Sequence, residues 1–171
     1  MKDKFILDAC CGPRHMWNNK KHPNAIYIDK RQEKKGFHPH RKNASVQPDI
    51  IMDFRNMKFK DCSFRLVVFD PPHMKGEPNS KMNLHQLFGV LDKVNWRSDL
   101  RKGFDECWRV LVDYGVLIFK WNDASISYTE ILKIFPHKPL FQQTSGSSRK
   151  KTYWACFMKI PEEYNLQEKL E

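Results

Sequence analysis

The stretch Leu66-Val67-Val68-Phe69-Asp70-Pro71-Pro72-His73 joins a short apolar, β-branched run to an acid, two prolines and an imidazole. Such a run predicts a buried strand, and the two prolines, which have no N–H to donate, predict that the strand stops at Asp70. In an open α/β sheet, this end of the strand lies at the carboxyl edge, where such sheets bind ligands. The alternative is an ordinary turn that happens to contain two prolines.

The residues after this strand suit an amine. The Asp70 carboxylate and the Pro71 carbonyl can accept both hydrogens of an exocyclic NH2 group, while His73 stacks on the ring that carries it. Pro71 and Pro72 give the segment a rigid backbone. Asp70, Pro71, Pro72 and His73 are therefore the candidate catalytic residues.

Composition limits the class of protein. The chain has 171 residues, which predicts one domain over residues 1–171, and 40% hydrophobic residues, which indicates a globular fold. No apolar stretch approaches the roughly 20 residues that cross a membrane, and no secretory signal opens the chain, so a cytoplasmic protein without a membrane partner is expected. The net charge of +10 favours a polyanionic partner such as nucleic acid, although a solvated basic surface would explain it equally simply.

The cysteines predict no disulfide framework and no metal site. Their number is odd and none forms a Cys-x-x-Cys pair, so reduced thiols are expected at Cys10, Cys11, Cys62, Cys107 and Cys156. The His38-Pro39-His40 segment lacks further ligands at suitable spacing.

Apolar runs and amphipathic stretches alternate along the chain. Strands are expected at 5–10, 25–29, 49–53, 66–70 and 115–121, helices at 98–112 and 127–135, and two final strands at 139–142 and 153–159 around a polar loop at 144–151. Residues 73–96 are expected to form a long loop with a helical turn near 84–91, and the charged tail after Pro161 is expected to fray. The pattern predicts an α/β fold of the doubly wound type, with a seven-stranded, mostly parallel sheet covered on both faces and a C-terminal antiparallel hairpin.

Further polar residues follow the first three predicted strands. Gly12, in the turn after the first strand, lets a ligand approach the backbone closely, and Asp29 ends the second strand where a carboxylate can bind ribose hydroxyls. Asp53 ends the third strand, and a purine could lie against Phe54. The pattern is that of a nucleoside-binding Rossmann-like fold, but it lacks the three glycines of a dinucleotide site and any lysine-containing phosphate loop. An adenosine cofactor without phosphate fits better than NAD or ATP.

In this order, the motifs resemble those of class I S-adenosylmethionine-dependent methyltransferases, in particular short versions often carried by phages and prophages. The matching segments are Asp8-Ala9-Cys10-Cys11-Gly12, Asp29, residues 53–64, Asp70-Pro71-Pro72-His73, and residues 108–111 running into 115–118. The resemblance implies that S-adenosylmethionine is the cofactor. It also implies that Asp8, Cys10 and Gly12 form the turn that holds its methionine part, that Asp29 binds its ribose, and that Asp53 and Phe54 bracket its adenine. Cys10 and Cys11 depart from the family's usual small or glycine residues.

The resemblance further implies methyl transfer to an amino group conjugated to a ring or carbonyl. The function expected first is methylation of an exocyclic amine of a DNA or RNA base, with adenine N6 favoured over cytosine N4. The alternatives are a methyltransferase acting on a protein side-chain amide and a non-catalytic subunit that binds nucleic acid. Relatives that modify amides usually carry Asn where this chain has Asp70, and the net charge also counts against the first alternative.

Basic residues are available for a phosphate backbone, although solubility alone would also explain them. The candidates are Lys34, Lys35, Arg41 and Lys42 in the basic stretch after the second strand, Lys75 and Lys81 beside the catalytic motif, and Arg149, Lys150 and Lys151 in the expected hairpin loop. No segment is left for a separate sequence-reading domain. Specificity is therefore expected from loops, from RNA shape, or from a partner subunit or homo-oligomer.

Overall fold

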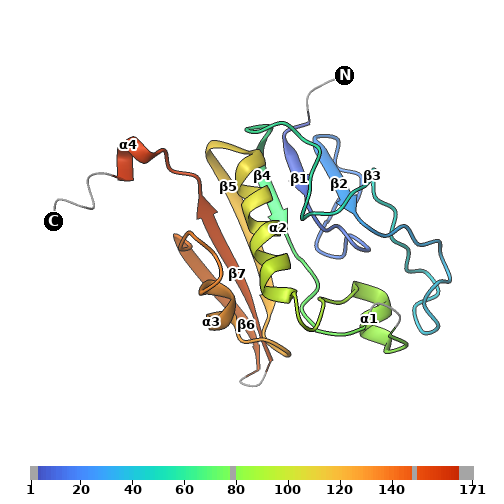
Figure 1. Cartoon of the computed structure of the whole chain (residues 1–171). Helices are drawn as coiled ribbons and strands as arrows, with labels where there is room; N and C mark the ends of the chain where they lie inside the picture. The colour runs from blue at the N-terminus through green and yellow to red at the C-terminus, as the bar shows by residue number, and fades with distance from the viewer. Residues whose placement is uncertain (1–3, 78–79, 148–149, 166–171) are drawn as a thin grey trace.

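The sheet has seven strands in the order β3-β2-β1-β4-β5-β7-β6 (Figure 1). The computed structural model describes residues 4–77, 80–147 and 150–165. The strands are β1 (Ile6–Asp8), β2 (Ala25–Asp29), β3 (Ile50–Ile51), β4 (Phe64–Phe69), β5 (Leu111–Asn122), β6 (Phe141–Ser147) and β7 (Lys150–Met158). The first five run parallel, whereas β7 is antiparallel to both β5 and β6. The predicted α/β fold with a mostly parallel sheet and a C-terminal antiparallel hairpin is confirmed.

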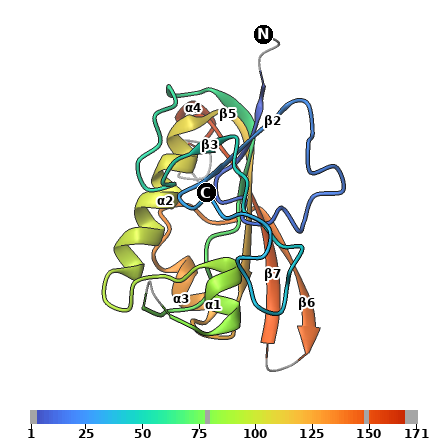
Figure 2. The same ribbon diagram turned by 90° about the vertical axis from the view of Figure 1, so that its right-hand side faces the viewer.

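Four helices complete the described structure: α1 (Asn83–Phe88), α2 (Trp96–Val110), α3 (Tyr128–Leu132) and α4 (Glu162–Asn165). The spacing of Leu100, Phe104 and Cys107 gives α2 one apolar side, and all three side chains are fully buried. They pack in one cluster with the strand residues Val67, Phe69, Leu117 and Phe119, and this cluster also includes Ile131 of α3. Figure 2 shows α2 and α3 on the same side of the sheet.

The opposite face of the sheet differs from the expected helical cover. The segment between β1 and β2 forms turns, and its Trp17 packs edge-on against Tyr27 at 4.9 Å between ring centroids. Farther along this face, Val116 and Ile118 of β5 remain partly exposed. This face is thus covered by a loop on one half and left open over β5 and the hairpin.

Element boundaries were predicted with mixed accuracy. Strand β2 matches the prediction, but the predicted strand at 49–53 contains only two sheet residues, Ile50 and Ile51, both exposed. The predicted break between a helix ending at residue 112 and a strand beginning at residue 115 is also wrong. Helix α2 passes directly into β5 at Leu111, and Tyr114 adopts φ +60° inside the strand while its N–H donates to the Lys159 carbonyl.

The final hairpin is longer than its hydrophobic pattern indicated. Most of the polar segment 144–151 belongs to β6 and β7 because these strands are held by backbone pairing, and Ser145, for example, pairs with Thr152. Lys150 and Lys151 therefore begin β7 and do not lie in a loop, and Arg149 falls outside the described residues. Among the described residues, no helix is long and apolar enough to cross a bilayer.

Candidate active site

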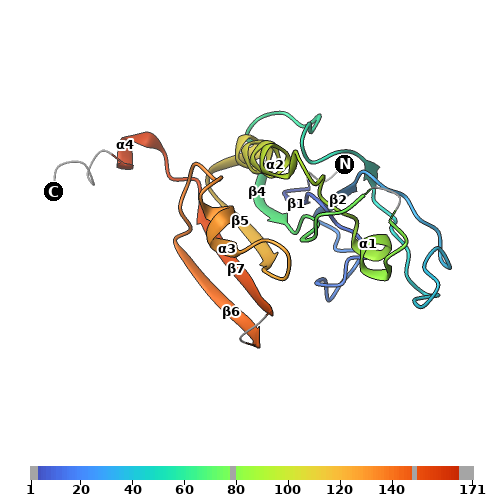
Figure 3. The same cartoon turned by 60° about the horizontal axis from the view of Figure 1, so that its bottom comes forward.

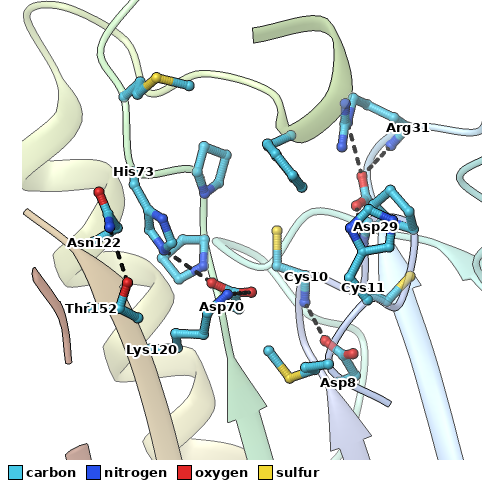
Figure 4. A pocket seen from close by; sticks show the side chains of 18 residues that line it. Asp8, Cys10, Cys11, Asp29, Arg31, Asp70, His73, Lys120, Asn122 and Thr152 are labelled. Carbon is cyan, nitrogen blue, oxygen red and sulfur yellow. Dashed lines mark hydrogen bonds and ion pairs between the residues drawn. The ribbon is translucent and has the colours of Figure 1, made fainter. Parts of the chain in front are cut away.

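The ends of β1, β2, β4 and β5 meet at one edge of the sheet around a cavity of about 300 Å³ (Figure 4). The sequence-predicted residues that line it are Asp8, Cys10, Gly12, Asp29, Asp70, Pro71, Pro72 and His73. Segments that lie far apart in the sequence are therefore brought together at one place. Among the described residues, no cluster of His, Cys, Asp or Glu is arranged to hold a metal ion.

Asp70 is the first residue after β4 and contacts a lysine and a histidine. Its Oδ2 accepts a hydrogen bond from Lys120 Nζ at 2.7 Å, and its Oδ1 lies 3.0 Å from His73 Nε2. Burial disfavours ionisation of Asp70, but its contacts with His73 and Lys120 outweigh burial and hold its pKa below the ordinary value. Asp70 is thus a partly buried carboxylate that stays charged.

One oxygen of Asp70 lacks a hydrogen-bond partner. The contact between Asp70 Oδ1 and His73 Nε2 lacks hydrogen-bond geometry, so both atoms are buried without a hydrogen-bond partner among the described residues. An unsatisfied buried acceptor is costly to a folded protein unless something else satisfies it. Both residues line the cavity, so a ligand that displaces the His73 ring slightly could satisfy both atoms.

The His73 ring is packed edge-on against Trp121, with 5.1 Å between the ring centroids. Trp121 is fully buried and donates its Nε1–H to the Ile126 carbonyl, so it is a packing residue. Stacking of His73 on a substrate ring remains a prediction.

Asp8 lies on the other side of the cavity and is 1% exposed. Its Oδ2 accepts the Trp17 Nε1–H at 2.7 Å, and its Oδ1 accepts the Cys10 N–H at 3.2 Å. Burial raises the pKa of Asp8 to about 7, against the lowering effect of these two hydrogen bonds.

Burial also raises the pKa of the Cys10 thiol well above its usual range, and the acids Asp29 and Asp8 add to this effect. Cys10 is accordingly a neutral thiol in the cavity wall.

Asp29 fixes the turn after β1 to the end of β2. Its Oδ2 accepts the Gly12 N–H at 2.9 Å and its Oδ1 accepts the Arg31 N–H at 2.9 Å. Gly12 has φ +46°, and an added Cβ would meet no atom within 4 Å, so the turn presents bare backbone to the cavity. Arg31 Nε also donates to Oδ1, at 3.4 Å. Because each carboxylate oxygen can accept two hydrogen bonds, Oδ2 keeps capacity for one more from a ligand.

Asp53 and Phe54 do not line this cavity. Phe54 is nearly buried, packs against Phe69 at 5.2 Å between ring centroids, and lines an adjoining cavity of about 380 Å³ together with Lys30, Arg31 and Pro72. Arg31 and Pro72 line both cavities. Asp53 pairs instead with Arg55 at 2.6 Å, and this pairing outweighs the effect of burial and lowers the pKa of Asp53.

The predicted phosphate-binding residues that the structure describes are all exposed. They are Lys34, Lys35, Arg41 and Lys42 in the loop between β2 and β3, Lys75 and Lys81 before α1, and Lys150 and Lys151 on β7. Figure 3 shows this loop and the β6–β7 hairpin projecting at the two ends of the ligand-binding edge. Lys75 also lies over the Trp96 ring at 5.7 Å.

The candidate site residues chosen from the sequence do not include Lys120, Asn122 or Thr152, although Lys120 lies near the end of a predicted strand, at a position that could contact substrate. Asn122 Nδ2 donates to Thr152 Oγ1 at 3.0 Å, and all three residues line the cavity. The signal for Lys120 was present in the sequence. Once β4 and β5 are aligned so that Phe69 pairs with Phe119, the next residues, Asp70 and Lys120, must be neighbours.

No protein-family model matches the sequence, and a search of curated proteins found no match. Solved structures do match. The chain shares 14% identity and a TM-score of 0.57 with the N-methyltransferase NodS from Bradyrhizobium japonicum WM9, over 92% of this chain and 86% of that one. A SAM-dependent methyltransferase from Methanosarcina mazei gives 11% identity and a TM-score of 0.57, over 94% of both chains. The chain has the fold of the class I methyltransferases that use S-adenosylmethionine (SAM).

This methyltransferase fold does not decide the acceptor atom. A geranyl diphosphate C-methyltransferase from Streptomyces coelicolor A3(2) also matches, with 10% identity and a TM-score of 0.58 over 92% of this chain and 73% of that one. The fold therefore occurs with transfer to nitrogen in NodS and to carbon in the Streptomyces enzyme. Fold alone does not define function, so the acceptor must be argued from the residues of the site.

The substitution Asp8→Asn is expected to remove a pH-dependent loss of stability. Because burial raises the pKa of Asp8 from 3.8 to about 7, the stability that comes from the neutral carboxyl is complete below about pH 4 and is lost as pH rises through 7. Relative to Asp8→Asn, the wild-type free energy of unfolding should fall by about 3 kcal/mol between pH 5 and pH 8. Denaturant titrations of the ligand-free protein measure this difference, with the exposed Asp113→Asn as control. Parallel pH profiles for wild type and Asp8→Asn would contradict the raised pKa.

Proposed function

We propose that this protein is a SAM-dependent N-methyltransferase that acts on the exocyclic amine of a nucleic-acid base, with adenine N6 favoured and cytosine N4 as the alternative. The observation that carries the proposal is the Asp70 carboxylate, which is partly buried, held charged, and left with Oδ1 without a hydrogen-bond partner in the same cavity as the Gly12 turn.

The cavity fits SAM at its methionine and ribose ends. Gly12 presents open backbone, and Asp8 is a buried acid that the cofactor's ammonium group would ionise. Asp29 Oδ2 retains capacity for a hydrogen bond from a ribose hydroxyl. The adjoining cavity beside Phe54 is the place we assign to the adenine ring. When bound, SAM supplies a methyl group on a positively charged sulfur.

Asp70 is placed to activate the acceptor amine, which is a poor nucleophile. An amine conjugated to a base ring delocalises its lone pair and is a poor nucleophile. Acceptance of its N–H groups by Asp70 Oδ1 and the Pro71 carbonyl favours a tetrahedral nitrogen and offsets the positive charge that develops there. As the nitrogen–carbon bond forms and the sulfur–carbon bond breaks, nitrogen gains a positive charge, and Asp70 is placed to take the proton it then releases. Lys120 and His73 hold Asp70 in the charged, oriented state that this role needs.

The net charge supports a nucleic-acid acceptor over a protein amide. Lys and Arg number 30 against 20 Asp and Glu, and the basic residues of the loop after β2 and of β7 are exposed at the two ends of the edge that holds the cavity. A base within a duplex must be flipped out of the stack to reach such a cavity.

Incubation with tritium-labelled SAM and separate pools of DNA, RNA and protein tests the function directly. Label is expected in a nucleic-acid pool, and mass spectrometry of the digested nucleosides should identify N6-methyladenine or, in the alternative, N4-methylcytosine. Label confined to the protein pool would overturn the proposal.

The substitution Asp70→Ala is expected to abolish transfer and to leave the affinity for S-adenosylhomocysteine within a few-fold of wild type, because Asp70 contacts the acceptor and not the cofactor's methionine part. Isothermal titration with S-adenosylhomocysteine and initial-rate assays separate the two effects. Asp70→Asn is the matched control for shape, and it should also be inactive because it loses the charge. Unchanged turnover in Asp70→Ala would exclude the proposed role.

The substitution Lys120→Met is expected to move the acid limb of the kcat profile to higher pH. Asp70 must be ionised, and removal of Lys120 takes away one of the contacts that lower the pKa of Asp70, so activity should be lost at a higher pH than in wild type. The exposed Lys133→Met on α3 serves as the control and should leave the profile in place. Identical acid limbs in wild type and Lys120→Met would show that Lys120 does not tune Asp70.

A further inference from the structure

The segment that contains the β6–β7 hairpin has an unusual charge distribution. Residues 131–161 contain six Lys or Arg residues and no Asp or Glu, so this part of the chain supplies much of the net charge of +10. Figures 1 and 3 show the hairpin projecting past the ends of β1 and β4, on the side where the cavity lies. A ligand that leaves the cavity toward β7 therefore meets strands that carry no acidic side chain, with Asp123 of the neighbouring turn bonded to the Lys151 N–H.

One face of this hairpin presents two aromatic rings to solvent. On β5, Phe119 and Trp121 face the core with α2, so Lys120 lies on the opposite, open face. Cross-strand pairing places Trp154 beside Lys120 and Phe141 beside Cys156 on that same face. Trp154 is 36% exposed and Phe141 is 67% exposed. Diagonal neighbours across an antiparallel pair are within reach of aromatic side chains, so the two rings form one surface.

This surface is continuous with the cavity. Lys120 Nζ lies 2.7 Å from Asp70 Oδ2 and 5.6 Å from the centroid of the Trp154 ring, so one side chain separates the catalytic carboxylate from the exposed indole. Thr152 lines the cavity, and Lys150 lies two residues farther along the same face of β7. We call Phe141, Lys150 and Trp154 the hairpin strip.

We infer that the hairpin strip binds the single-stranded nucleotides next to the target base. Trp154 and Phe141 stack on base faces, and Lys150 contacts a phosphate. Exposed aromatics on a basic sheet face are what single strands recognise, because their unpaired bases offer free faces for stacking. A duplex buries those faces within its own stack. This inference rests on the proposed function and specifies its substrate as single-stranded nucleic acid.

Fluorescence anisotropy with a labelled 12-nucleotide single strand and its duplex, in the presence of S-adenosylhomocysteine, tests the inference. Wild type should bind the single strand more tightly, and Trp154→Ala and Phe141→Ala should each weaken that binding about tenfold. Trp154→Tyr should restore it, because a smaller aromatic ring still stacks. Lys150→Ala should weaken binding and lower the salt slope by about 0.7.

Matched controls separate stacking from general effects. Tyr164→Ala removes an exposed aromatic on α4, and Lys133→Ala removes an exposed charge on α3, and neither should change binding. Unchanged affinity for S-adenosylhomocysteine shows that each variant is folded.

The possible failures are distinguishable. Suppose that wild type methylates nucleic acid but that Trp154→Ala and Phe141→Ala bind the single strand as tightly as wild type. The hairpin strip then does not bind the strand, and the proposed function stands. Tighter binding of the duplex, or a concentration-dependent dimer that Trp154→Ala abolishes, would overturn the single-strand assignment. If wild type neither binds nor methylates any nucleic acid, both proposals fail.

Discussion

The alignment of the parallel strands β1, β4 and β5 is the constraint on which the site depends. Asp8 pairs with Val68, and Phe69 pairs with Phe119, so the ends of the three strands lie level. Side chains along a strand alternate between the two faces of the sheet. Since Phe69 and Phe119 are buried on the face covered by α2, Asp70 and Lys120 both lie on the opposite face. A slip of one residue in β5 would turn Lys120 into the core and leave Asp70 buried without its cation.

This alignment gives the protein two opposite electrostatic regions. The cavity gathers the acids Asp8, Asp29 and Asp70 and balances them with only Arg31 and Lys120. The chain as a whole has a net charge of +10. An acid-lined cavity favours a cationic ligand, and a basic exterior favours an anionic one. In the proposed function, the positively charged sulfonium and ammonium groups of SAM meet the first region, and a phosphate backbone meets the second.

The sequence predicted the convergence of the motifs better than the individual contacts. Strand β2 and the positions of Asp29 and Asp70 could be predicted because each apolar run ends in an acidic residue. Such a strand end is marked by neighbouring residues alone. The contact between Asp70 and Lys120 depends on the register of two strands about fifty residues apart, which periodicity alone does not set. Phe54 was expected beside a purine, but it packs largely inside the core, because ring size and apolarity suit both places. The strands of the hairpin are longer than their hydrophobic pattern predicts, because backbone pairing, and not burial, extends them through Ser145 and Thr152.

The proposed methyl transfer requires that the cofactor's sulfur and Asp70 face each other across a single cavity. A crystal structure of the protein with S-adenosylhomocysteine and adenosine measures this arrangement directly. We expect the homocysteine part over the Gly12 turn, with its sulfur toward Asp70, and the adenosine amino nitrogen within hydrogen-bond distance of Asp70 Oδ1. Homocysteine bound elsewhere, or a sulfur that faces away from Asp70, would contradict the account.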